Sequence, residues 1–334
     1  MRYSISQAMY FNTYGIPLVG ADICGFIGNT TPELCLRWMQ LGAFYPFMRN
    51  HNSWDTIAQE PWAFGPAYLM PMREATYLRY SLLRYIYTSY YQVTQNGGTF
   101  FRPLFFKWEN DAKLYEAPES NFLVGDALMV SPILEEGTTQ RTVYFPTGGA
   151  WVNHANGEVL NLMSAQEVTY SVGMESMFVH QIPGTIVPRQ TTGTRNNPIL
   201  RTNKLNTVRT LLHITVDPSG MASGMLQFDD GVSLIKSDST NYMSFSLAFA
   251  SNMLTITNTS PQGATYDGMD AHMAQMFFYG VDKPSSVTLK FVDTSKADVA
   301  LDFTYNEDDM MLFVTWNVSQ IDVTFAEVSQ VVFA

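Results

Sequence analysis

The chain has 334 residues, 46% of them hydrophobic, which is enough for one large core or roughly two to three domains. Only 15% of the residues are charged and the net charge at pH 7 is −11, which argues against nucleic acid as a partner because phosphate binding needs a cationic face. No apolar run reaches the roughly 18 residues of a membrane span, and residues 1–10 lack the hydrophobic core of a signal peptide.

The first hundred residues predict helices that alternate with short buried strands. "SISQAMYFNTYG" predicts a helix over 4–15, and "IPLVGADI" (16–23) predicts a strand buried on both faces. "TPELCLRWMQLG" predicts a second helix, with Thr31 as its N-cap and Pro32 at its first position. "AFYPF" (43–47) predicts a second buried strand, and an apolar stripe predicts a long helix from about Glu74 to the stop signal Asn96-Gly97-Gly98.

From about Phe100 onward the hydrophobic pattern changes to a period of two. "SVTLKFV" (286–292) and "IDVTFAEV" (321–328) alternate apolar and polar residues, which predicts antiparallel strands packed as sandwiches. The polar, turn-rich segment "PRQTTGTRNNP" (188–198) predicts a linker. The predicted fold is therefore α/β followed by all-β: the last two strands and helices of a (β/α)₈ barrel over 1–102, a proximal β domain over 103–190 and a distal β-sandwich domain over 191–334.

Polar side chains follow both predicted barrel strands. Asp22 comes after the first, and Arg49 and His51 come after the second. The carboxyl ends of barrel strands carry the catalytic loops, so these groups are candidates for a site, although Asp22 and Arg49 could instead form a buried structural ion pair. Phe26 follows in the first loop, where an aromatic ring could be plain packing or could hold the apolar face of a sugar.

The two cysteines, Cys24 and Cys35, allow two interpretations from composition alone. They could be buried thiols, or a disulfide that would require an oxidising compartment. Asn-x-Ser/Thr triplets at Asn29, Asn258 and Asn317 favour the secretory interpretation, although such triplets also arise by chance.

Other chemistries find little support in the sequence. The five histidines are scattered without zinc-ligand spacing, and no phosphate-binding loop or nucleophile elbow occurs. "FDDG" (228–231) is more typical of a hairpin turn than of a calcium site. We therefore expect no metal and no cofactor.

The stretches "GIPLVGADICGF" and "CLRWMQLGAFYPFMRNHN" closely resemble glycoside hydrolase family 31, and most closely its lysosomal and digestive α-glucosidases. The likeness continues through "QEPWAF", "RYSLLRYIYT", "RPLFF", "FLVGDALMVSPILEEG", "YFPTGGAW" and "FDDG", and it weakens after about residue 240. It implies that the two buried strands are the seventh and eighth of the barrel.

The resemblance also implies roles for individual residues. Asp22 and Phe26 would line the subsite for the non-reducing glucose. Arg49 would end the eighth strand, and His51 would hydrogen-bond sugar hydroxyls. Cys24 and Cys35 would form a disulfide that braces the loop carrying Phe26. Members of the family are retaining enzymes, with one catalytic Asp in a Trp-x-Asp-Met-Asn-like motif and a second in a Gly-Asp-Asn-like motif. Neither motif occurs in these residues, so no catalytic residue is expected in this chain.

The resulting expectation is the C-terminal portion of a retaining α-glucosidase that releases terminal non-reducing α-linked glucose and is inactive alone. Its partners would be an α-glucoside oligosaccharide and the missing N-terminal part of the same enzyme, in the lysosome or the secretory pathway. The alternative is a non-catalytic carbohydrate-binding or interaction protein derived from the family. A weaker possibility would recruit Asp55 or Glu60, which are expected in the loop after the eighth strand, for catalysis.

Overall fold

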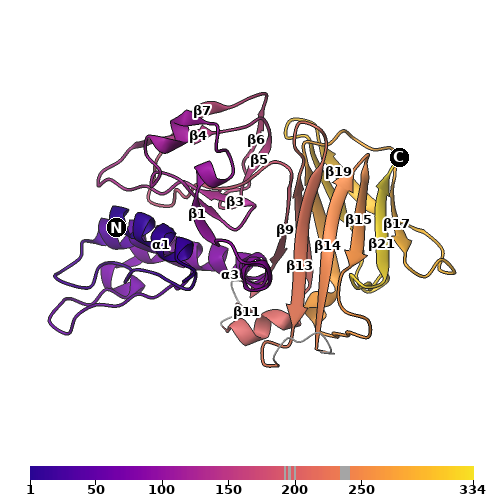
Figure 1. The fold of residues 1–334 in the computed structure, drawn as a ribbon, viewed down its shortest axis with the longest axis horizontal. Coiled ribbons are helices and arrows are strands. Elements are labelled where there is room, and N and C mark those ends of the chain that lie inside the picture. The colour runs from indigo at the N-terminus through magenta and orange to yellow at the C-terminus, as the bar shows by residue number, and fades with distance from the viewer. Residues whose placement is uncertain (192, 195–196, 199–200, 234–240) are drawn as a thin grey trace.

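The fold has a helical N-terminal part and two β-rich parts (Figure 1). The structure is a computed structural model that describes residues 1–191, 193–194, 197–198, 201–233 and 241–334. The two chain ends lie at opposite ends of the molecule's long axis, with the smaller β part next to the helices and the larger one next to the C-terminus. None of the helices in these ranges is both long and apolar enough to cross a membrane.

The N-terminal part consists of the three long helices and one short one. Their bounds are α1 Arg2–Thr13, α2 Pro32–Gly42, the 3₁₀ helix η1 Pro61–Phe64 and α3 Pro66–Asn96. Thr31 caps α2 as predicted, since its hydroxyl accepts a hydrogen bond from the Leu34 N–H at 3.2 Å. Helix α3 begins eight residues earlier than predicted, at Pro66, because proline is well tolerated at the first position of a helix and Pro71 within it does not end it.

The two predicted barrel strands, 16–23 and 43–47, are not regular strands, and this part of the prediction is wrong. The two segments run parallel and share one isolated bridge, between Ile23 and Asn50. A continuous ladder does not form because Pro17 and Pro46 lack the N–H group that a ladder needs. Leu18 is 66% exposed, so the first segment is also not buried on both faces.

The smaller β part contains an antiparallel sheet and a two-stranded ribbon. The sheet has the order β1-β2-β3-β8-β5-β6, and β4 pairs with β7. The bounds are β1 Phe101–Pro103, η2 Leu104–Phe106, η3 Ala112–Tyr115, β2 Phe122–Val124, β3 Leu128–Val130, β4 Gln140–Phe145, β5 Gly149–Asn153, β6 Val159–Leu162, β7 Gln166–Ser171 and β8 Val179–Gln181. One face of the sheet packs on the helices through Phe122 and Leu128, and the other face packs on the ribbon through Leu123 and Met129.

The larger β part is one continuous 11-stranded sheet that encloses a core of buried aliphatic and aromatic side chains. Its order is β18-β17-β21-β15-β14-β13-β9-β12-β16-β20-β19. The bounds are β9 Thr185–Gln190, β10 Gly193–Thr194, β11 Asn197–Pro198, η4 Thr202–Thr207, β12 Thr210–Thr215, β13 Ala222–Asp229, β14 Tyr242–Ala250, β15 Met253–Asn258, η5 Met269–Ala271, β16 Met273–Tyr279, β17 Val287–Phe291, β18 Val299–Ala300, β19 Asp302–Asn306, β20 Met311–Thr315 and β21 Val328–Phe333. Most pairs are antiparallel, but β12 pairs with β16, and β13 with β9, in parallel.

Three local predictions for this part need correction. Residues 321–328 alternate in burial, but only Val328 belongs to a strand, β21. The residues before it have a single bridge at Thr324 followed by a turn, in which Glu327 accepts hydrogen bonds from the N–H and hydroxyl of Thr324. "FDDG" does not make a tight hairpin, since β13 ends at Asp229 and β14 begins at Tyr242. The predicted linker 188–198 begins within β9, which pairs with β12, and residues 192 and 195–196 of it lie outside the described residues. The domain boundaries at 102 and 190 stay predictions.

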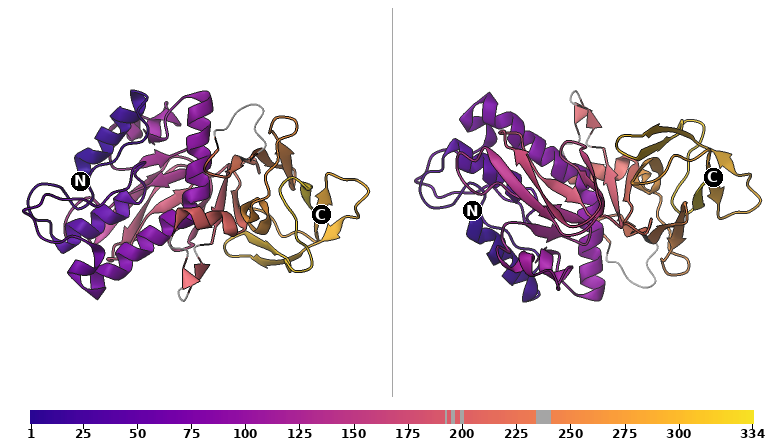
Figure 2. Two further views of the ribbon diagram at one scale, coloured as in Figure 1. Left: turned by 90° about the horizontal axis from the view of Figure 1, so that it is seen from below. Right: turned by 90° about the horizontal axis from the view of Figure 1, so that it is seen from above.

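Helix α3 connects the N-terminal part to the larger sheet. Figure 2 shows it lying along the boundary between these parts. At this boundary the Gln190 side chain enters the helix: its amide donates to the Tyr80 carbonyl at 2.7 Å, and its oxygen accepts from the Arg84 backbone N–H at 3.1 Å. The amide thus bridges two residues that are one helical turn apart and links helix and sheet.

Candidate active site

The two segments that carry the candidate site are joined directly by backbone hydrogen bonds. The Phe47 N–H donates to the Val19 carbonyl at 3.0 Å, and the Ile23 N–H donates to the Arg49 carbonyl at 2.9 Å. Gly20 permits this close approach, because a Cβ atom at that position would lie 1.9 Å from the Phe47 carbonyl oxygen. The ends of both segments therefore lie side by side, as the sequence predicts.

Asp22 and Arg49 form an ion pair at these ends. The Arg49 Nε donates to Asp22 Oδ1 at 3.0 Å, and a terminal nitrogen of Arg49 donates to the same oxygen. The side chains are 24% and 50% exposed, respectively, so the pair is not buried. The Arg49 guanidinium also lies 5.5 Å from the centre of the Phe47 ring. Both of these bonds use Oδ1, and no donor among the described residues bonds the second oxygen, Oδ2.

Phe26 and His51 form the second half of the cluster. Their ring centroids are 5.3 Å apart and the rings are tilted by 38°. Phe26 is 43% exposed, so part of its ring is open to a ligand. The two loops are joined here as well, because the Ser53 N–H donates to the Phe26 carbonyl at 2.9 Å. An apolar ring face beside an imidazole is an arrangement that can pack against a pyranose ring and hydrogen-bond its hydroxyls.

Gln59 is a central residue of this site that the sequence analysis did not single out. Its buried side-chain nitrogen lies within hydrogen-bond distance of the carbonyls of Ile23 (3.1 Å) and His51 (3.0 Å) and of the side-chain oxygen of Asn50 (3.0 Å). One amide therefore holds both loops in register. The sequence signal was the stretch "QEPWAF" in the family resemblance, but nothing in its pattern says which atoms the glutamine meets.

A disulfide joins Cys24 and Cys35, and both residues are buried. It ties the loop of Asp22 to helix α2, with a Cα–Cα distance of 4.2 Å. Cys24 has φ +75° and Gly25 has φ +95°, so the chain turns sharply just before Phe26. The disulfide braces the loop that presents the ring.

The remaining predicted residues lie outside the cluster. Asp55 and Glu60 are exposed, and the Asp55 carboxylate accepts from the Ser53 hydroxyl at 2.6 Å. The sequon asparagines Asn29, Asn258 and Asn317 are all exposed. In the described part of the chain, no group of three or more His, Cys, Asp or Glu side chains is placed to hold a metal ion.

Two histidines that are distant in the sequence come together in the interior. The ring centroids of His154 and His213 are 5.1 Å apart. His154 Nδ1 lies 2.8 Å from an Arg189 nitrogen, and its Nε2 lies 3.0 Å from the Gln181 side-chain oxygen. Because both ring nitrogens of His154 are occupied, this pair is a structural network at the junction of the two β parts.

Comparisons with known proteins agree with the sequence resemblance. Residues 1–89 match the glycosyl hydrolases family 31 TIM-barrel domain, and residues 97–187 match the glycosyl hydrolase family 31 C-terminal domain. The lysosomal alpha-glucosidase of Rattus norvegicus is 36% identical over 332 residues, which cover 94% of this chain and 33% of that protein. The alpha-glucosidase of Hordeum vulgare is 38% identical over 231 residues, which cover 69% of this chain and 25% of that protein.

Solved structures show the same fold over the whole chain. A glucosidase II alpha subunit superposes with a TM-score of 0.85 at 21% identity, covering 100% of this chain and 36% of that one. A GH31 dextranase of Flavobacterium johnsoniae superposes with a TM-score of 0.77 at 20% identity, covering 100% of this chain and 42% of that one. At these identities the likeness concerns the fold alone. The chain spans about a third of the length of the first curated relatives that it matches.

Proposed function

Because the chain belongs to glycoside hydrolase family 31, and matches the C-terminal part of its α-glucosidases, we propose that it is part of a retaining α-glucosidase that releases terminal non-reducing α-linked glucose. In this proposal Asp22, Phe26, Arg49 and His51 bind the terminal sugar and carry out no bond cleavage. The observation that carries the proposal is the joining of the two loops by backbone hydrogen bonds, with the Phe26–His51 ring pair and the Asp22–Arg49 ion pair both spanning them.

Each group in the cluster has a role that its geometry supports. Asp22 is held by Arg49 through Oδ1, so its second oxygen can accept a hydrogen bond from a sugar hydroxyl without reorganisation. The Phe26 ring would cover the apolar face of the pyranose, and His51 next to it would bond a hydroxyl at the edge. Gln59 and the Cys24–Cys35 disulfide would keep these groups in position.

We further propose that the chain alone does not hydrolyse glycosides. Retention requires two carboxylates about 5–5.5 Å apart, one that attacks the anomeric carbon and one that protonates the leaving oxygen. The cluster of Asp22, Phe26, Arg49 and His51 contains one carboxylate, which is already paired. The two catalytic groups would come from the preceding part of the same enzyme.

That preceding part is also the proposed protein partner. Ile16 (52% exposed), Leu18 (66%) and Phe47 (43%) leave apolar surface open along the two barrel segments. Strands of a closed barrel pair on both edges and turn such side chains inward, so the missing strands would cover them. The proposed location is the lysosome or the secretory pathway, which the disulfide, the exposed sequons and the names of the mammalian relatives support.

The experiment that tests the proposal compares two proteins in release of 4-nitrophenol from 4-nitrophenyl α-glucoside. One is the chain as given, and the other is the chain extended by the reading frame upstream of Met1. We expect turnover by the extended protein only. Turnover by the short chain that is abolished by Asp55→Asn or Glu60→Gln would overturn the proposal, since a local carboxylate would then perform the chemistry.

The sugar-binding roles are tested in the extended enzyme by His51→Ala and Phe26→Ala. Loss of a hydrogen bond that leaves a buried hydroxyl unsatisfied costs about 1–3 kcal/mol, so His51→Ala should lower kcat/KM by roughly 5- to 150-fold. Asp55→Asn, in the same loop but outside the cluster, is the matched control and should leave kcat/KM unchanged. Equal kcat/KM for His51→Ala and the control would show that His51 does not bind the sugar.

A further inference from the structure

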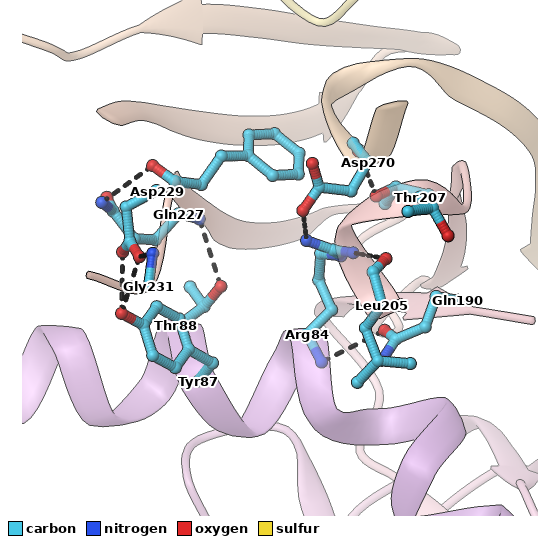
Figure 3. A network of polar contacts seen from close by, with 12 residues as sticks. Arg84, Tyr87, Thr88, Gln190, Leu205, Thr207, Gln227, Asp229, Gly231 and Asp270 are labelled. Atoms are coloured by element: carbon cyan, nitrogen blue, oxygen red, sulfur yellow. Dashed lines mark hydrogen bonds and ion pairs between the residues drawn. The ribbon is translucent and has the colours of Figure 1, made fainter. Parts of the chain in front are cut away.

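A concave site lies between helix α3 and the end of strand β13, and of the two barrel segments only Pro46 lines it. It is a cavity of about 610 Å³, within the range of roughly 300–1,000 Å³ that is typical of small-molecule sites. Strand β13 and the turn after it form one wall, α3 forms another, and the short helix η4 closes the side (Figure 3). It shares no residue with the cluster of Asp22, Phe26, Arg49 and His51.

An aromatic ring in a locked orientation lines this cavity. Tyr87 is 48% exposed, and its hydroxyl lies 2.9 and 2.8 Å from the two carboxylate oxygens of Asp229. The Gly231 N–H donates to Asp229 Oδ1 at 2.8 Å, so the carboxylate is fixed from a second side (Figure 3). A ring held this way presents its face without losing rotamer freedom when a ligand binds.

Polar groups that can both accept and donate line the same cavity. Asp230 is fixed by the N–H groups of Val232 (2.9 Å) and Ser233 (2.7 Å), and it lies next to Asp229. Asn203 and Asn206 of η4 also line the cavity, and their side-chain amides have no hydrogen-bond partner within the described part of the chain. Carboxylates and amides in one cavity with an aromatic ring are the groups that bind the hydroxyls and the apolar face of a pyranose.

The walls of the cavity are held rigidly by buried contacts behind them. Arg84 of α3 and Asp270 form an ion pair in which both side chains are almost fully buried, 8% and 4% exposed. Thr88 of α3 accepts a hydrogen bond from the Gln227 N–H at 3.1 Å (Figure 3). Because helix and sheet are fixed to each other on both sides of Tyr87, the cavity exists before any ligand enters.

We propose that this cavity is a second carbohydrate-binding site, which holds a neutral oligosaccharide on the Tyr87 face with its hydroxyls on Asp229, Asp230 and the η4 amides. Two carboxylates disfavour phosphorylated or acidic ligands. The described residues offer no cluster of three ligands for a metal ion. The site does not depend on hydrolysis, and only the choice of an α-glucan as the oligosaccharide rests on the proposed function. It would anchor a chain whose end is processed elsewhere.

The test measures binding of maltotriose to the 334-residue chain by isothermal titration, with folding of each variant checked by its melting curve. We expect saturable binding that Tyr87→Ala weakens by about tenfold or more, since roughly 1.4 kcal/mol of ring contact is lost. Tyr87→Phe keeps the ring and should weaken binding by only about threefold. Asp229→Asn keeps the shape and should weaken it between these two.

Tyr3→Ala, at an exposed ring outside both sites, is the control and should leave this affinity unchanged. Phe26→Ala and His51→Ala show how much of the binding belongs to the barrel loops, and Tyr87→Ala should still weaken binding when it is combined with either of them. If either one abolishes binding while Tyr87→Ala does not, maltotriose sits at the loops and the second site is refuted. Absence of saturable binding to a folded wild-type chain would refute it as well. Both results can be read without any activity assay, so they are distinct from a failure of the proposed function.

Discussion

Replacing His180 should make the chain less sensitive to acid. His180 is fully buried in the smaller β part, and neither of its ring nitrogens has a hydrogen-bond partner within the described residues. Aromatic rings surround it, with the Phe145 centroid at 4.8 Å in an edge-on arrangement and the Tyr170 centroid at 6.1 Å. Burial lowers the pKa of His180 to about 3.

The sign follows from proton binding in the two states. The unfolded chain binds a proton at His180 below pH 6.5, roughly the ordinary pKa of histidine, whereas the folded chain does not bind one until about pH 3. The free energy of unfolding therefore falls as the pH drops below 6.5, by about 2 kcal/mol per such histidine between pH 7 and pH 5. Burial also lowers the pKa values of His154 and His213, which adds to the loss in the same direction.

The assay is urea unfolding of the wild type, His180→Leu and His180→Asn at pH 7 and pH 5. Neither substituted side chain takes up a proton, so both variants should lose about 2 kcal/mol less than the wild type between the two pH values. Only His180→Leu also removes the unsatisfied polar group, so at pH 7 it should be more stable than His180→Asn by about 1–3 kcal/mol. An unchanged pH dependence in both variants would refute the reasoning, because His180 would then be protonated in the folded state.

Three further changes test the contacts that hold the parts of the chain together. Gln190→Ala should lower the free energy of unfolding by about 1–3 kcal/mol, since the Tyr80 carbonyl and the Arg84 N–H lose their partner. Gln190→Glu should also be less stable than the wild type, because a carboxylate cannot donate a hydrogen bond to the Tyr80 carbonyl. Asp270→Asn should cost about 3–5 kcal/mol in urea unfolding, because Arg84 stays buried without its counter-charge; Asp267→Asn, at an exposed carboxylate nearby in the chain, is the control. Mass spectrometry of non-reduced protein should show no free thiol. Cys35→Ser should lower the free energy of unfolding by roughly 2–3 kcal/mol, as expected for a disulfide between cysteines 11 positions apart.

Local signals in the sequence predicted the local structure well. Thr31 caps α2, Gly97 ends α3 with φ +73°, and Val287 and Leu289 of β17 are buried on one face as their alternation indicates. Each of these depends on atoms within a few residues in the chain. The ion pair of Asp22 and Arg49 was raised as an alternative for a different reason, because both residues follow apolar runs expected to lie side by side in a barrel; the structure has the pair, but it is not buried.

Contacts between distant segments were not predictable in the same way. The entry of Gln190 into α3 joins residues about a hundred positions apart, and the approach of His154 to His213 depends on how two sheets pack. The segment 16–23 reads as a buried strand because strand propensity does not include its partners. Its regularity depends on neighbouring strands, and among the described residues only the segment ending in Arg49 pairs with it.

Contacts within this chain fix the two segments that carry Asp22, Phe26, Arg49 and His51. Arg79 of α3 donates to the carbonyls of Ala43 at 2.6 Å and Tyr45 at 2.8 Å, which fixes the second segment just before Arg49. Asn12 of α1 accepts from the N–H groups of Phe100 and Phe101 and so ties the first helix to the smaller sheet. These contacts involve no missing barrel strand. The loop geometry around Asp22 and Phe26 is therefore a property of this chain, and under the proposed function a preceding part would add the cover over the apolar segments and the two carboxylates that cleave the bond.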